Sequence, residues 1–64
     1  MLYEFSDGVY INLREVATMV CYSNNAIEIT MTNRKSYTRY CKDSKEMQSI
    51  RLDIQSGVTA AYHI

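Results

Sequence analysis

The spacing of apolar residues changes once along this chain, and that change limits what the chain can fold into. Up to residue 42, short runs alternate apolar and polar side chains, which is the period of a β-strand with one buried face. From Asp43 onward, Met47, Ile50 and Ile54 recur at the spacing of one helix face. We therefore expect an α+β fold: a small antiparallel β-meander of four to five strands with one C-terminal helix packed on one face.

Turn-forming residues divide the alternating part into strands. Asp7-Gly8 is typical of a hairpin turn, and Asn24-Asn25 tolerates the positive φ of a tight reversal. Residues 33–35 make a third reversal, and residues 14–16 form a corner. The strands predicted between these breaks are residues 2–5, 9–13, 17–23, 26–32 and 36–41.

The length of the loop at Asn24-Asn25 decides which face of the preceding strand is buried. A two-residue loop would bring Val20 and Tyr22 to the core side. A three-residue loop would instead bring Met19 and Cys21 there, because a slip of one residue exchanges the two faces. Both alternatives are open from the sequence. The following strand has a clear inward face, made of Ile27, Ile29 and Met31.

The helix starts with a recognisable signal. Asp43 is a cap acceptor, and Glu46 follows three residues later in the pattern of a capping box. Gly57 is placed to end the helix, which we therefore predict over residues 44–55. The apolar tail at residues 58–64 is expected to add a strand or to contact another subunit.

The chain has 64 residues, which make a single domain over residues 1–64. A domain this short buries only about 60% of its unfolded surface, so its stability margin is thin. The two cysteines, Cys21 and Cys41, lack the close spacing of a zinc site, and His63 is the single histidine. A Cys21–Cys41 disulfide is one alternative, and two reduced thiols are the other, which we favour. We expect no metal or cofactor, and we expect self-association to supply stability.

Neither the start of the chain nor its charge favours a membrane or a polyanion as partner. The first residues show no basic segment followed by a long apolar stretch, so we predict no signal peptide and no membrane span. Together with reduced cysteines, this indicates a cytoplasmic protein. Seven acidic and seven basic residues give zero net charge, which argues against a general polyanion binder.

No sequence pattern points to catalysis. The chain has no glycine-rich phosphate loop, no nucleophile elbow and no metalloprotease motif. A nucleophile–base pair would need His63, next to the last residue, to reach Cys21 or Cys41. The sequence therefore predicts no catalytic residues and no enzymatic activity.

Residues 34–42 interleave basic and aromatic side chains along a predicted strand. Period-two geometry places Tyr37 and Arg39 on one face and Tyr40 on the other. Such a strand could stack single-stranded bases and pair with phosphates. It could instead pack one tyrosine beneath the helix while its charges protect an exposed sheet edge. The candidate partner-binding residues are Arg34, Lys35, Tyr37, Arg39, Tyr40, Lys42 and, in the tail, Tyr62.

Six tyrosines are too many for a core this small to bury, so some must be exposed or lie at an interface. The chain as a whole resembles the short accessory proteins that bacteriophages and other mobile elements encode to bind and modulate a host machine. That resemblance implies stoichiometric binding to a host protein, often as inhibition. We expect a small non-enzymatic protein-binding module that modulates or inhibits a partner protein and is homo-oligomeric. The alternative is a small nucleic-acid-binding protein that uses residues 34–42.

Overall fold

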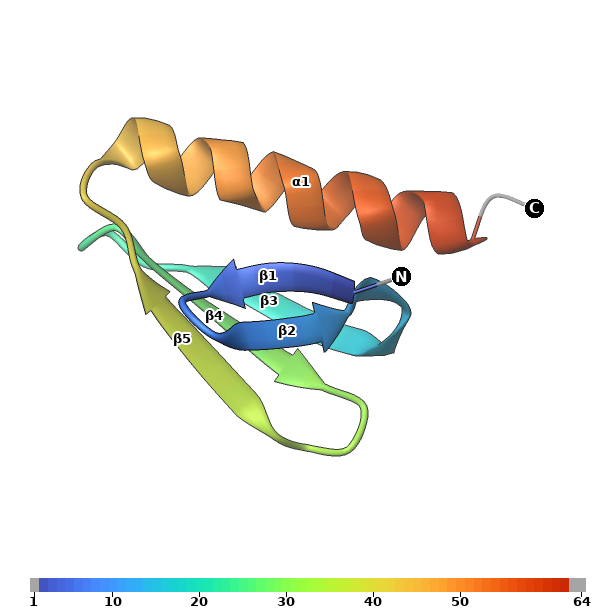
Figure 1. Cartoon of the computed structure of the whole chain (residues 1–64). Helices are drawn as coiled ribbons and strands as arrows, with labels where there is room; N and C mark the ends of the chain where they lie inside the picture. Colours follow the sequence, from blue (N-terminus) through green and yellow to red (C-terminus); the bar gives the residue numbers. More distant parts are fainter. Residues whose placement is uncertain (1, 63–64) are drawn as a thin grey trace.

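The α+β fold is confirmed: five antiparallel strands are followed by one C-terminal helix (Figure 1). The structure is a computed structural model and describes the backbone of residues 2–62 and the side chains of residues 2–57. In chain order the elements are β1 (Leu2–Ser6), β2 (Val9–Asn12), the 3₁₀ turn η1 (Leu13–Glu15), β3 (Val16–Cys21), β4 (Ala26–Met31), β5 (Ser36–Tyr40) and α1 (Ser44–Tyr62).

The strands form two sheets rather than one. β1 and β2 make a hairpin, and β3, β4 and β5 make a three-stranded sheet with β4 in the centre. The 3₁₀ turn at η1 separates the two sheets, and α1 lies across them (Figure 1). The core lies where the hairpin, the helix and one face of the three-stranded sheet meet. Its buried residues are Phe5, Ile11, Val16, Ile27, Ile29, Met31, Ile50 and Ile54.

Two β-bulges interrupt the regular strand pairing beside this core. In β1 the pairing register shifts between Glu4 and Ser6, so Phe5 is the extra residue, and its side chain is fully buried. In β3 the register shifts between Val16 and Thr18. Strict alternation would turn Val16 outward together with Thr18, but the bulge at this point turns Val16 into the core.

The turns lie where the sequence predicts them. Gly8 has a φ of 76°, which fits the Asp7-Gly8 hairpin turn. The next loop has three residues, because Tyr22 and Ala26 pair through the Tyr22 N–H and the Ala26 carbonyl at 2.8 Å. This register settles the alternative left open by the sequence: the inner face carries Met19 opposite Ile29 and Cys21 opposite Ile27.

The start of α1 is confirmed by its cap. The backbone N–H of Glu46 donates to Oδ1 of Asp43 at 2.8 Å, as a capping box requires. In the other direction, the Glu46 carboxylate accepts the N–H of Lys42 at 3.3 Å, one residue before the expected position. Ile50 and Ile54 are buried, which confirms the face of the helix that the spacing predicts.

The predicted end of the helix is wrong. The helix does not stop before Gly57 but continues to Tyr62. Gly57 has a different role, because a Cβ atom there would overlap Cδ1 of Leu13 and lie 3.3 Å from its Cβ and Cγ. The glycine lets the helix approach η1 closely. The expected extra strand is also wrong for residues 58–62, whose backbone is helical, and residues 63–64 lie outside the described part.

Candidate functional site

One face of the three-stranded sheet is covered by neither the helix nor the hairpin. Residues on β3, β4 and β5 alternate between this face and the core, as the pairing of the strands dictates. We call it the outer face. Its residues are Thr18, Val20 and Tyr22 on β3 or directly after it, Ala26, Glu28 and Thr30 on β4, and Ser36, Thr38 and Tyr40 on β5.

Three large side chains are exposed on the outer face. Tyr40 is 76% exposed, Tyr22 is 44% exposed and Val20 is 43% exposed. The register places Tyr22 and Tyr40 in one row on either side of Ala26, and it places Val20 beside Glu28 in the next row. The remaining positions carry short hydroxyl side chains. The face is therefore a small apolar and aromatic patch with a polar surround, which is typical of an interaction surface.

The patch is hollowed between its two tyrosines. A groove of about 290 Å³ is open to solvent here. Ala26 is only 3% exposed although it belongs to the outer face, because large side chains flank it. We call this hollow the tyrosine groove. Its lining residues are Tyr22, Asn24, Ala26, Glu28, Thr38 and Tyr40.

Glu28 gives the tyrosine groove a negative charge. The phenol of Tyr22 donates to Oε1 of Glu28 at 2.8 Å. This hydrogen bond, and then the charge of the carboxylate, raise the pKa of Tyr22 above its ordinary value. No other described residue that lines the groove is charged. The groove therefore combines two aromatic rings with one carboxylate.

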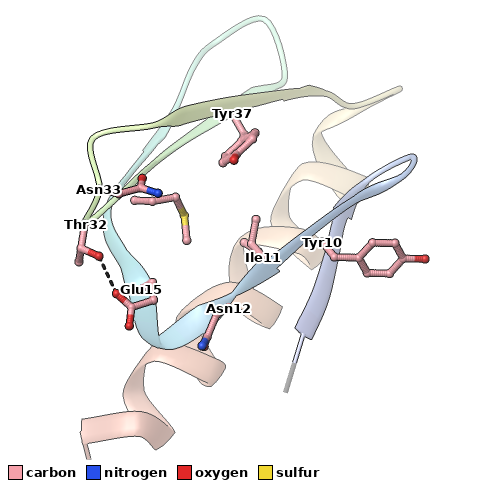
Figure 2. A pocket seen from close by; sticks show the side chains of 8 residues that line it. Tyr10, Ile11, Asn12, Glu15, Thr32, Asn33 and Tyr37 are labelled. Carbon is pink, nitrogen blue, oxygen red and sulfur yellow. Dashed lines mark hydrogen bonds between the residues drawn. The ribbon is translucent and has the colours of Figure 1, made fainter.

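A second hollow lies at the seam between the two sheets (Figure 2). Its volume is about 350 Å³. Several of its polar groups are already used locally: the hydroxyl of Thr32 donates to Glu15 at 2.6 Å, and the Asn33 side chain accepts the N–H of Lys35 at 3.0 Å. Figure 2 shows the ring of Tyr10 pointing away from the hollow. These bonds brace the loops, and the groups in them are not aimed at a ligand.

The structure does not bring the sequence-predicted site residues together on one surface. Tyr37 packs against the core, and Arg39 lies on the same inner side. Arg39 donates from Nη1 to the carbonyl of Phe5 at 3.0 Å and from Nη2 to Glu46 at 3.4 Å. It therefore ties β5 to the β1 bulge and to the helix, and it is engaged within the protein.

The other predicted residues lie at the ends of β5 or beyond it. Arg34 and Lys35 are exposed in the turn before the strand, where Arg34 has a φ of 72°. Tyr40 lies on the outer face, and Lys42 is exposed in the segment leading to the helix. The side chain of Tyr62 is outside the described residues. Of the members of this set whose side chains the structure describes, only Tyr40 lines the tyrosine groove.

Sequence reasoning missed Tyr22, Glu28 and Val20 as members of a common surface. The missing information was the loop length after β3, since it decides whether Tyr22 faces the core or the solvent. The observation that the core could not bury every tyrosine was correct: Tyr10, Tyr22 and Tyr40 are exposed. That observation alone does not say which of the six are exposed.

Among the described residues, the cysteines show no arrangement for nucleophilic chemistry. Both are free, with Cys21 exposed and Cys41 partly buried, and the central strand β4 lies between the strands that carry or precede them. Burial raises the pKa of the Cys41 thiol, which lowers its thiolate fraction. His63 lies outside the described residues. Within the described part of the chain, no three metal-ligating side chains come together.

Comparisons with known proteins give no match: no family model, no curated protein and no solved structure matches this chain. The geometry of the outer face and the chemistry of its side chains therefore carry the functional argument. No helix in the part of the chain that the structure describes is both long and apolar enough to span a bilayer.

Proposed function

We propose that this protein is a small non-enzymatic protein-binding module and that the outer face of the β3–β4–β5 sheet is its contact surface. The observation that carries the proposal is the exposure of Val20, Tyr22 and Tyr40 together on the face left open by the helix and the hairpin. Tyrosine offers a large contact area at low entropic cost, and it is enriched at protein interfaces. The module would act stoichiometrically, modulating or inhibiting its partner by covering part of the partner's surface.

The size of the outer face indicates how far the contact extends. Strands of five or six residues are about 17–20 Å long, and three strands at about 4.8 Å spacing are roughly 15 Å wide with their side chains. A standard interface buries about 800 Å² on each partner, which exceeds this area. The contact must therefore continue over the neighbouring loops. The exposed Arg34, Lys35 and Lys42 flank the face at its two ends and would belong to its rim.

The nucleic-acid alternative has less support from the geometry. It requires Arg39 and Tyr37 beside exposed basic residues, but both of these side chains lie on the inner side of the sheet. Arg39 already has two partners within the protein. Steep loss of binding to single-stranded RNA or DNA as salt rises would favour this alternative over the protein-binding proposal.

Self-association stays a prediction. The tail residues on which it rested have side chains outside the described part, so the proposal of a subunit contact there rests on sequence alone. Sedimentation at micromolar concentration, repeated on a chain truncated after Gly57, is the measurement that checks it. A full-length monomer would end this prediction. The free cysteines are compatible with a cytoplasmic location, which we keep as part of the proposal.

Site-specific photo-crosslinking tests the proposed contact surface. A photoreactive amino acid at Thr38, on β5 in the middle row of the outer face, should cross-link one protein in an extract of the host cell. The same amino acid at Ser49, an exposed position on the helix, serves as the matched control. The captured protein is then purified and titrated with the chain and with two single variants, Tyr40→Ser and Tyr10→Ser.

The expected result is a cross-link from Thr38 only and loss of affinity in Tyr40→Ser only. Tyr10 is a fair control because it is also exposed, at 60%, but lies on the hairpin. Cross-linking from Ser49 but not from Thr38, or equal loss of affinity in both tyrosine variants, would place the contact elsewhere and refute the proposal.

A further inference from the structure

Tyrosine side chains form both walls of the tyrosine groove, and a small side chain forms its floor. Tyr22 and Tyr40 stand on either side of Ala26, whose methyl group is the smallest side chain of the row. Because neighbouring strands are about 4.8 Å apart, these two positions are separated by about 10 Å. A group placed midway would lie about 5 Å from each of these positions, which is compatible with the roughly 6 Å over which an aromatic face attracts a cation.

The floor of the groove adds a negative charge next to this position. Glu28 follows Ala26 two residues along β4 and therefore lies on the same face. Its Oε1 accepts the phenol of Tyr22 at 2.8 Å, while Oε2 has no donor among the described residues. The hydrogen bond holds the carboxylate toward Tyr22 and leaves one oxygen available. Among the described residues, no basic side chain lines the groove to neutralise it.

We propose that the tyrosine groove receives a lysine or arginine side chain of the partner protein, held between the rings of Tyr22 and Tyr40 and paired with the Glu28 carboxylate. This inference rests on the proposed function, since it names the chemistry that the outer face recognises in its partner. The charge complementarity of the groove is the argument for a basic occupant.

Other occupants fit the groove less well. An apolar side chain would remove water from Glu28 without giving the carboxylate a counter-charge, and a buried charge without a partner is costly. An acidic side chain would be repelled by Glu28. A basic side chain meets both features, because its cationic head reaches the carboxylate while its methylene stem lies along the rings. Covering by the partner would strengthen the pairing by excluding water.

The experiment is an NMR titration of the full chain with single-residue probes. The probes are N-acetyl-lysine methylamide and N-acetyl-arginine methylamide, with N-acetyl-norleucine methylamide as the uncharged analogue of similar length. The resonances followed are the ring protons of Tyr22 and Tyr40. We expect saturable shifts of these rings with both cationic probes and binding of norleucine weaker by roughly fivefold or more, the factor that cation–π and carboxylate contacts supply at exposed sites.

Two variants test the assigned residues, each with a matched control. Glu28→Gln and Tyr40→Ala should each weaken the cationic probes by about threefold or more. Glu15→Gln is the control for the carboxylate, because Glu15 also accepts one side-chain hydroxyl but lies outside the groove. Tyr10→Ala is the control for the exposed ring. Both controls should bind the cationic probes as the original chain does.

Three outcomes would overturn the inference: norleucine binding as tightly as lysine, Glu28→Gln behaving like Glu15→Gln, or no saturable shift at the two rings. Each leaves the proposed contact surface standing if Thr38 still cross-links the partner. Loss of the Thr38 cross-link would instead refute the contact surface itself. The two failures are therefore distinguishable.

Discussion

Replacing Gly57 by alanine sets two opposing effects against each other. Glycine within a helix is about 0.8–1.0 kcal/mol less favourable than alanine, so in an unconstrained helix the substitution would stabilise the protein by that amount. Here the new methyl group would overlap the end of the Leu13 side chain and lie 3.3 Å from its Cβ and Cγ. Leu13 packs against the core and would have to move.

Steric crowding is expected to win. Inserting a methyl group into a packed contact costs about 1–3 kcal/mol, which exceeds the gain in helix propensity. We expect Gly57→Ala to lower the free energy of unfolding by about 1 kcal/mol, which for a domain of this size is a fall in Tm of roughly 4–8 °C. Urea and thermal unfolding followed by circular dichroism measure both quantities.

The decisive control shortens Leu13, whose side chain the new methyl group would overlap. A Leu13→Ala background removes Cγ and Cδ1 and leaves only the Cβ of residue 13 near the new methyl group, at 3.3 Å, so Gly57→Ala should then raise stability by up to about 1 kcal/mol. The substitution changes sign between the two backgrounds, with a coupling of up to about 2 kcal/mol. Stabilisation by Gly57→Ala in the original chain would refute the reasoning, because it would mean that the helix is not held closely against η1.

Three further predictions follow from single contacts. Arg39→Met removes the bonds to Phe5 and Glu46 but keeps an apolar stem, and it should cost about 1–2 kcal/mol in urea unfolding; an unchanged midpoint would show that the tie contributes nothing. Arg34 has a left-handed backbone conformation, so Arg34→Gly should raise the free energy of unfolding by about 1 kcal/mol. Asn25→Gly, at a φ of 64°, should raise it by less, because asparagine tolerates this conformation. Equal increases in the two variants would contradict the reasoning. The pKa of Tyr22 is raised above 10.0 in the folded state, so its bond to Glu28 stabilises the fold below pH 10 and is lost as pH rises through the folded pKa. The stability difference between the original chain and Tyr22→Phe should therefore shrink above pH 10, and a constant difference would mean that the bond is absent in solution.

Much of the fold could be predicted because local signals agree with it. Alternation located the strands, Asp7-Gly8 and Asn24-Asn25 marked turns, and Asp43 with Glu46 located the start of the helix. Each of these signals depends only on a few residues that are close in the sequence. The end of the helix could not be predicted in this way. A glycine has the same sequence signature at a helix end and at a close helix contact, and here the contact is with η1, more than forty residues away.

The site was predicted less well for a related reason. Period-two geometry correctly separated Tyr37 and Arg39 from Tyr40, but it could not say which of the two faces was buried. The role of Arg39 depends on the bulge at Phe5, which no local pattern announces. Tyr22 became a surface residue only because the loop after β3 has three residues rather than two. One residue of loop length thus decided the composition of the candidate site.

The alternation of inner and outer positions along β3, β4 and β5 also bears on how such a protein can diverge between lineages. Substitutions at inward residues such as Ile27 and Ile29 are limited by the stability of the fold. Substitutions at Tyr22 and Tyr40 are limited only by binding to the partner. Partner choice can therefore drift without loss of the scaffold. Related chains should keep their inward positions apolar while their outer positions vary with each partner. Chains that bind the same partner should carry similar residues on the outer face.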